Sequence, residues 1–98
     1  MVKTELSANV LDELFQIIQS RAEENIPDSY TASLLAQGRE KICQKLGEEG
    51  VETIIAALGK DKKKVIYESS DLLFHLLVLW HDVGIIPLEV FKELKSRF

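Results

Sequence analysis

The sequence predicts an all-α fold in which two long helices form an antiparallel hairpin. Apolar residues recur at helical spacing along nearly the whole chain, and only two prolines, Pro27 and Pro87, interrupt it. Ile85-Ile86 is the only plausible extended piece, and it is too short to make a sheet. Long helices joined by a short turn pack as antiparallel neighbours, so the hairpin is the expected centre of the fold.

Helices are expected, in chain order, at about residues 7–24, 31–37, 39–58, 62–83 and 87–95, with a loop at 25–30. The first helix has Ser7 or Asn9 as its cap and carries apolar residues on one face, namely Val10, Leu11, Leu14, Phe15 and Ile18. Pro27 and its Asn, Asp and Ser neighbours favour the loop. Gly38 ends the short second helix.

The two long helices are bounded by residues that end and begin helices. Gly59 ends the first of them, and Asp61 is a suitable N-cap for the second, which leaves a tight connection between them. Gly84 ends the second long helix. Pro87 stands in the first turn of the last helix, where a missing N–H is tolerated.

The second long helix is apolar around most of its circumference, and a chain of 98 residues cannot bury all of that surface alone. Pairing two hairpins across a twofold axis would bury it. We therefore expect a four-helix-bundle-type homodimer, or a higher even oligomer, with Phe74 and Leu77 in the interface.

Length and composition indicate a single domain spanning residues 1–98. The hydrophobic share of 46% and the charged share of 29% are those of a globular chain, not a disordered one. The net charge of −4 disfavours a general affinity for nucleic acid, whereas divalent cations can bridge acidic residues to phosphates. The single cysteine, Cys43, fits a reducing cytoplasm. No signal peptide or membrane span is expected, because the longest apolar stretch, Leu72–Trp80, is far below the ~20 residues that cross a bilayer.

Three carboxylates crowd one side of the first long helix. Lys45, Glu48, Glu49 and Glu52 stand at i, i+3, i+4 and i+7, and they share one stripe of a helix that is otherwise largely apolar. Like charges at these spacings repel, and only Lys45 offsets them. A multivalent cation would stabilise such an arrangement.

The second long helix carries Glu68 and Asp71, with His75 further along the same ridge. Glu52 and Glu68 lie at comparable heights on the two arms of the hairpin, each about 10 Å from the turn. The five carboxylates can therefore surround one site, and an all-oxygen set favours Mg²⁺ or Mn²⁺ over zinc. The alternative, that each acidic pair is merely solvated, leaves the alignment of the two groups unexplained.

These residues resemble a known pattern. Glu48-Glu49-x-x-Glu52, followed after fifteen residues by Glu68-x-x-Asp71, is similar to the metal-binding signature of the MazG-like all-α nucleoside triphosphate pyrophosphatases. From about Leu11 to Arg97 the chain resembles the phosphoribosyl-ATP pyrophosphohydrolase family, in the segments Ser29-Tyr30-Thr31, Gly38, Lys45-Leu46-Gly47-Glu48-Glu49 and Asp71-Leu72-Leu73-Phe74-His75-Leu76-Leu77-Val78. Gly50 stands where the family more often has Ala, and Phe74 where it often has Tyr, and neither change removes a ligand.

The resemblance implies Mg²⁺-dependent hydrolysis of phosphoribosyl-ATP to phosphoribosyl-AMP and pyrophosphate, the second step of histidine biosynthesis. The favoured metal ligands are Glu49, Glu52, Glu68 and Asp71. Glu48 is a further ligand or the general base, so Glu48 and Glu49 are the candidate catalytic residues. Lys45 belongs to the family motif and is expected to contact substrate phosphate, although pairing with Glu48 or Glu49 is the alternative.

Two further groups of residues flank the acidic motif. Ser29, Tyr30 and Thr31 precede a helix whose free N–H groups are suited to a phosphate, but the same residues also read as an N-cap and turn. His75 is either a second-shell partner of Asp71 or a core histidine with satisfied hydrogen bonds, and the second interpretation is favoured.

Two other functions compete with this one. A house-cleaning pyrophosphatase of the same superfamily, acting on a (deoxy)nucleoside triphosphate, would share the metal site. A non-catalytic acidic helical dimerisation module would need no divalent cation, but it leaves the clustered carboxylates unexplained.

Overall fold

The computed structural model describes residues 6–24 and 28–98. Within these ranges the fold is all-α, as predicted, and no strand is present. Its helices are α1 (Asn9–Glu24), α2 (Tyr30–Gln37), α3 (Arg39–Leu58), α4 (Lys62–Val83) and α5 (Pro87–Lys95).

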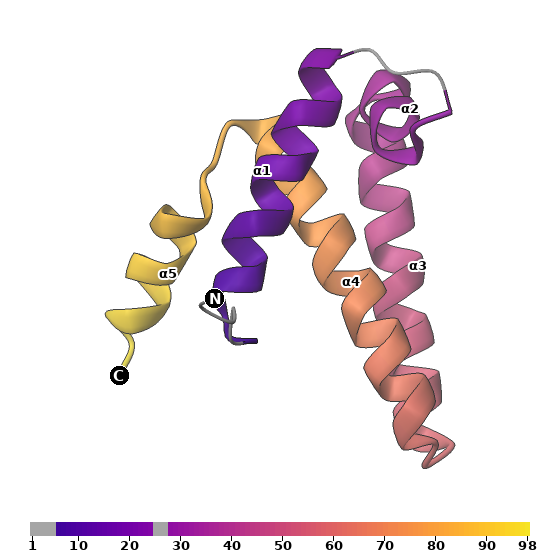
Figure 1. The fold of residues 1–98 in the computed structure, drawn as a ribbon. Helices are drawn as coiled ribbons and strands as arrows, with labels where there is room; N and C mark the ends of the chain where they lie inside the picture. Colours follow the sequence, from indigo (N-terminus) through magenta and orange to yellow (C-terminus); the bar gives the residue numbers. More distant parts are fainter. Residues whose placement is uncertain (1–5, 25–27) are drawn as a thin grey trace, which may run out of the picture.

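Helices α3 and α4 form the predicted antiparallel hairpin, and they pack side by side along their lengths (Figure 1). The Asp61 carboxylate accepts a hydrogen bond from the Lys64 N–H at 3.1 Å and thereby caps α4. Lys60 adopts a positive φ of 60° in the turn, and the Asp61 N–H donates to the carbonyl of Ala56. The predicted end of α3 at Gly59 and the predicted N-cap of α4 at Asp61 are therefore confirmed.

The other helices gather around the half of the hairpin that is distant from its turn. Helix α1 packs on α4, α2 packs on α3 and α1, and α5 lies beside α1. The turn half of the hairpin projects beyond them, as Figure 1 shows. The core beneath α1 and α2 contains Phe15, Ile18, Leu34, Ile42, Leu77 and Val78.

The prediction that Leu77 lies in a dimer interface is wrong. Leu77 has no exposed surface in the single chain, because it faces the core formed with α1 and α2. Phe74, which was predicted beside it, is half-buried and packs against the same core. The sequence showed that α4 is apolar on most sides, but it did not show which side the chain covers with its own helices.

The predicted helix bounds agree with the structure except near the N-termini of the first two helices. Helix α1 begins at Asn9, and the Ser7 Oγ accepts a hydrogen bond from the Asn9 N–H at 3.2 Å. Helix α2 begins one residue earlier than predicted, at Tyr30, so Tyr30 belongs to the helix and not to the predicted loop. The part of that loop at 25–27 lies outside the described residues. Val10, which was assigned to the apolar face of α1, is half exposed.

The chain bends sharply between α4 and α5. Gly84 takes a left-handed conformation with φ 84°, which ends α4, and the Ile85 N–H donates to the carbonyl of Trp80 at 2.8 Å. In the described ranges no single helix is long and apolar enough to cross a membrane. Only α4 and α5 taken together pass that test, and they are bent by 108° relative to one another.

Candidate functional site

Four carboxylates face one another across the hairpin. Potential ligand atoms of Glu49 and Glu52 on α3 and of Glu68 on α4 all lie within 4.8 Å of one another. Glu49 also belongs to a second group of three, with Asp71 and His75 of α4, whose potential ligand atoms likewise lie within 4.8 Å of one another. Because Glu49 is common to both groups, they form one cluster, which we call the acidic cluster: Glu49, Glu52, Glu68 and Asp71.

Glu49 lies at the centre of the acidic cluster and is 5% exposed. Burial, together with the neighbouring carboxylates of Glu52 and Asp71, raises its pKa from an ordinary 4.5 to about 7. A carboxylate only accepts hydrogen bonds, so its contacts with these neighbours become hydrogen bonds only when a proton is held between them. Among the described residues, the Glu49 Oε2 atom has no hydrogen-bond partner.

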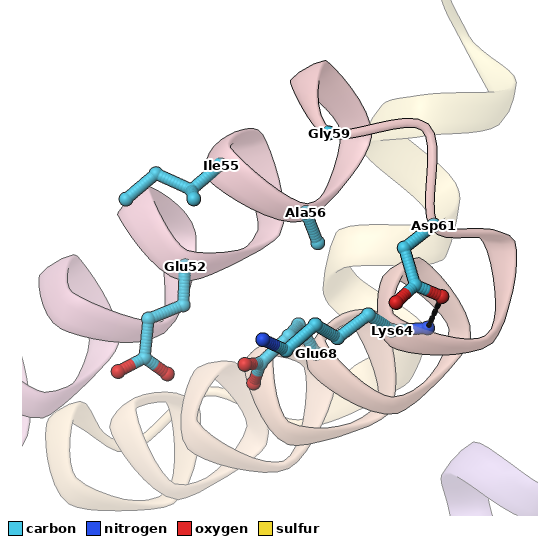
Figure 2. Close-up of a pocket in the computed structure, with 7 residues that line it drawn as sticks. All are labelled: Glu52, Ile55, Ala56, Gly59, Asp61, Lys64 and Glu68. Atoms are coloured by element: carbon cyan, nitrogen blue, oxygen red, sulfur yellow. Dashed lines mark hydrogen bonds between the residues drawn. The ribbon is translucent and has the colours of Figure 1, made fainter.

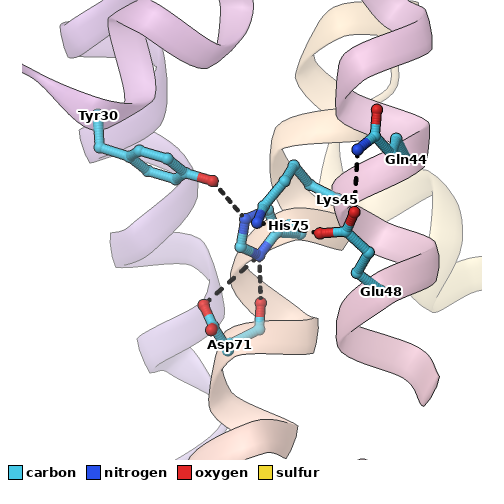
Figure 3. Close-up of polar contacts among 6 residues, drawn as sticks. All are labelled: Tyr30, Gln44, Lys45, Glu48, Asp71 and His75. Carbon is cyan, nitrogen blue, oxygen red and sulfur yellow. Dashed lines mark hydrogen bonds and ion pairs between the residues drawn. The ribbon is translucent and has the colours of Figure 1, made fainter. Parts of the chain in front are cut away.

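The structure does not bring Glu48 into the acidic cluster. Its exposed carboxylate accepts hydrogen bonds from the Gln44 Nε2 at 2.9 Å and from the Lys45 Nζ at 3.2 Å (Figure 3). These two donors lower the pKa of Glu48. Adjacent residues of a helix point about 100° apart, so Glu49 faces α4 while Glu48 faces solvent. The stripe predicted for Lys45, Glu48, Glu49 and Glu52 spans about 100° of the helix, and Glu48 at one edge of it points away from α4.

Lys45 pairs with Glu48, which is the alternative that the sequence left open. The hydrogen bond to Glu48 is the main reason that the pKa of Lys45 is raised. Lys45 is also close enough to Tyr30, the first residue of α2, for each group to affect the pKa of the other. Lys45 therefore stands at the end of the acidic cluster that is nearer to α2.

The surroundings of His75 agree with both interpretations that the sequence allowed, a partner of Asp71 and a buried histidine with satisfied hydrogen bonds. It is 2% exposed, and both of its ring nitrogens have polar neighbours. The Nδ1 atom lies 2.8 Å from the main-chain oxygen of Asp71, and the Nε2 atom lies 2.9 Å from the hydroxyl of Tyr30 (Figure 3). The sequence did not predict the contact with Tyr30, because 45 residues separate the two positions.

The three residues Ser29, Tyr30 and Thr31 have different surroundings. The Ser29 hydroxyl accepts a hydrogen bond from the Ala32 N–H at 3.1 Å, so it caps α2 as the alternative reading expected. Thr31 is buried. Tyr30 is half exposed, and its ring lies 6.1 Å from that of Phe74 and 5.9 Å from that of His75.

A cavity of about 440 Å³ lies between the two arms of the hairpin near the turn, and Figure 2 shows the residues that line it: Glu52, Ile55, Ala56, Gly59, Asp61, Lys64 and Glu68. Burial raises the pKa of Glu68, and so do the charges of Glu52 and Asp71, whereas Lys64 acts in the opposite direction. Lys64 was not among the predicted site residues. Its spacing of four residues from Glu68, which puts both on one ridge of α4, was the available signal.

Comparison with known proteins identifies the family. The sequence model of the family described as phosphoribosyl-ATP pyrophosphohydrolase matches residues 11–98, which is most of the chain. The chain belongs to the phosphoribosyl-ATP pyrophosphohydrolase family.

Individual members of this family are similar over almost the whole chain. A phosphoribosyl-ATP pyrophosphatase of Paramagnetospirillum magneticum is 50% identical over 92% of this chain and 83% of its own length. That of Azospirillum brasilense is 46% identical over 99% of this chain and 87% of its own. The enzyme of Saccharolobus solfataricus is 41% identical over 94% of this chain and 98% of its own.

The acidic cluster fits the divalent cation that the resemblance to this family implies. All four carboxylates offer oxygen, the ligand atom that Mg²⁺ and Mn²⁺ prefer. The buried and unpartnered Oε2 of Glu49 is the strongest single indication, because a buried polar atom in a folded protein normally has a partner. A cation bound among these oxygens would provide it.

Proposed function

We propose that this protein hydrolyses phosphoribosyl-ATP to phosphoribosyl-AMP and pyrophosphate, the second step of histidine biosynthesis. The observation that carries the proposal is Glu49, a buried carboxylate with an unpartnered oxygen, surrounded by three more carboxylates. This site occurs in a chain that is 50% identical to a phosphoribosyl-ATP pyrophosphatase. We place the reaction in the cytoplasm, where Cys43 would stay reduced.

The residues of the acidic cluster would hold Mg²⁺, with Mn²⁺ as a chemically similar substitute. When bound, the cation supplies positive charge that neutralises phosphate oxygens and makes phosphorus easier to attack. The protein holds its four carboxylates together on two helices that pack along their lengths, so the site is formed before the substrate arrives.

We assign the direct catalytic role to Glu49 and a supporting role to Glu48. Glu49 is buried at the centre of the acidic cluster, where its carboxylate would hold the cation directly, whereas Glu48 is exposed and lies outside the cluster. The pKa of Glu48 is lowered by its hydrogen bonds with Gln44 and Lys45, which makes it a weaker proton acceptor. Glu48 instead holds the side chain of Lys45 next to the cluster.

We assign substrate binding to Lys45 and Tyr30, at the α2 end of the acidic cluster. Lys45 offers a cation for phosphate, and the half-exposed ring of Tyr30 offers an apolar face. Ser29 and Thr31 support this end indirectly, because Ser29 caps α2 and Thr31 is a buried residue of its first turn.

We also propose that two copies of the chain associate through the turn half of the hairpin. This half carries exposed apolar side chains that the other helices do not cover, namely Val51, Ile54, Ile55, Leu58 and Ile66. Each of them is more than half exposed in the single chain. A second hairpin placed across a twofold axis presents the same residues and would bury both sets in a four-helix bundle.

The experiment that tests the function is a measurement of pyrophosphate release with Mg²⁺. Phosphoribosyl-ATP is compared with ATP and with a panel of deoxynucleoside triphosphates, for the wild type, Glu48→Gln, Glu49→Gln and Glu13→Gln. Glu13 is an exposed glutamate of α1 and serves as the matched control. We expect release from phosphoribosyl-ATP alone, a loss of about 100-fold or more in Glu49→Gln, since even the partners of metal ligands are worth up to about 100-fold, and a smaller loss in Glu48→Gln.

Each other outcome points to a different function. Preference for a simple triphosphate would assign the protein to the house-cleaning pyrophosphatases. Equal losses in Glu48→Gln and Glu49→Gln would contradict the separate roles that we assign to them. No release from any substrate would leave the non-catalytic dimerisation module as the remaining explanation.

A further inference from the structure

Tyr30 and His75 form an arrangement that substrate binding alone does not explain. Tyr30 is the first residue of α2, and its hydroxyl oxygen lies 2.9 Å from the Nε2 atom of His75 in α4. On the other side of the ring, Nδ1 lies 2.8 Å from the main-chain oxygen of Asp71 and 3.5 Å from its Oδ1. A continuous line of polar contacts therefore runs from the half-exposed Tyr30 to the acidic cluster, as Figure 3 shows.

The direction of these hydrogen bonds follows from which atoms can donate. A carbonyl oxygen only accepts, so in the neutral imidazole the proton is on Nδ1 and points at Asp71. The Nε2 atom then has a free lone pair, and the Tyr30 hydroxyl donates to it. Burial raises the pKa of Tyr30 above its ordinary value of 10.0, so the phenol keeps this proton at neutral pH.

The burial of His75 makes the hydroxyl of Tyr30 important. The ring is 2% exposed, and without the hydroxyl its Nε2 would be a buried acceptor with no partner. Because both nitrogens already have partners, His75 acts on the cluster through Asp71. A potential ligand atom of Asp71 lies within 4.8 Å of a potential ligand atom of Glu49. A change in the orientation of the Asp71 side chain therefore alters the surroundings of Glu49 at the centre of the cluster.

We propose that Tyr30 is a positioning residue for the acidic cluster: its hydroxyl holds the His75 ring in one tautomer and orientation, and the Nδ1–H of that ring is then directed at Asp71, whose carboxylate lies next to Glu49. This inference rests on the proposed function only where it treats Asp71 as a ligand of the divalent cation. Partners of this kind, which contact a ligand and not the metal, commonly change metal affinity by about 10- to 100-fold.

The packing of the Tyr30 ring allows the hydroxyl to be tested alone. The ring lies against those of Phe74 and His75, and these contacts do not involve the oxygen. Tyr30→Phe therefore removes the hydrogen bond and keeps the packing. Tyr67→Phe is the matched control, because Tyr67 is exposed and its hydroxyl has no hydrogen bond within the described residues.

The first measurement is the ¹⁵N-edited NMR spectrum of the histidine rings in the metal-free protein at pH 8. The protein has two histidines, and His81→Gln assigns the signals. We expect a Nδ1–H tautomer for His75, with a proton that exchanges slowly with water. In Tyr30→Phe the Nε2 resonance should move and the Nδ1–H proton should exchange faster, while Tyr67→Phe should match the wild type.

The second measurement is the affinity for Mg²⁺ by titration calorimetry, where Tyr30→Phe should bind about tenfold more weakly or worse. A Nε2–H tautomer in the wild type, or a Tyr30→Phe variant with an unchanged ring spectrum and unchanged Mg²⁺ affinity, would overturn the inference. The ring spectrum needs neither metal nor substrate. Absence of pyrophosphate release by the wild type would therefore refute the proposed function while leaving this test of Tyr30 intact.

Discussion

At the scale of single residues, the acidic cluster depends on one carboxylate that the fold buries among others. Glu49 is only 5% exposed and lies beside Glu52 and Asp71, so its charged form destabilises the folded protein. The unpartnered Oε2 adds to that cost. Such a residue is expected where a site needs its charge for binding or catalysis, and a structural role alone would be served better by glutamine.

The pKa of Glu49 predicts how the stability of the metal-free protein depends on pH. The pKa of the Glu49 carboxyl is about 7 in the folded protein, against an ordinary 4.5. Protonation of Glu49 therefore adds to the free energy of unfolding in full below pH 4.5, and this addition is lost as pH rises through 7. The loss amounts to at most roughly 3 kcal/mol in the free energy of unfolding. We expect the melting temperature, measured with a chelator, to fall between pH 5 and pH 8 by more in the wild type than in Glu49→Gln.

Adding Mg²⁺ at pH 8 should reverse this effect in the wild type, because a ligand that binds only the folded state stabilises it. Glu49→Gln should gain less from Mg²⁺. Parallel pH profiles for the two proteins would show that Glu49 is not the group that titrates in this window.

At the scale of elements, the hairpin holds the site, and α3 contains two glycines close to its carboxylates. Gly47 and Gly50 flank Glu48 and Glu49, and each weakens a helix interior relative to alanine. A Cβ atom built on Gly50 would lie 4.0 Å from the Leu72 side chain, which is an ordinary contact. The hairpin therefore has room for alanine at this position.

Gly50→Ala should raise the free energy of unfolding by about 1 kcal/mol. The substitution removes backbone freedom from the unfolded chain and adds a contact with α4, without changing any carboxylate. Urea unfolding followed by circular dichroism measures the change. A destabilised variant would mean that α3 and α4 pack more closely at Gly50 than the structure indicates.

At the scale of the whole molecule, the turn half of the hairpin is left uncovered by the other helices (Figure 1). Most of the exposed apolar residues of α3 and α4 lie there, whereas Leu77 lies in the core under α1 and α2. A charge at Leu77 would unfold the protein and would not report on assembly. A test of assembly must use the exposed residues.

Ile54→Asp should convert the proposed dimer to a folded monomer. Ile54 is 59% exposed in the single chain, so the aspartate costs little there but would be an unpaired charge in an apolar interface. Sedimentation velocity measures the mass, and circular dichroism confirms that the helices persist. Val10→Asp, at an exposed apolar position of α1, is the control that should leave assembly unchanged. An Ile54→Asp protein with the mass of the wild type would place the interface elsewhere.

Local signals in the sequence determined the helices of this protein. Gly59, Asp61, Gly84 and Pro87 act on their own neighbours, so the bounds of α3, α4 and α5 could be predicted without a fold. The equal heights of Glu52 and Glu68 also followed from counting residues outward from a tight turn, and these side chains do meet.

Only the tertiary structure decided which side of each helix faces its partner. That choice turns Glu49 toward α4 and Glu48 toward solvent, and it places Leu77 in the core. It also joins Tyr30 to His75 across 45 residues of chain. Periodicity gives the angle between residues on one helix, but the rotation of a helix about its axis is set by packing against other helices, whose contacts are distant in the sequence.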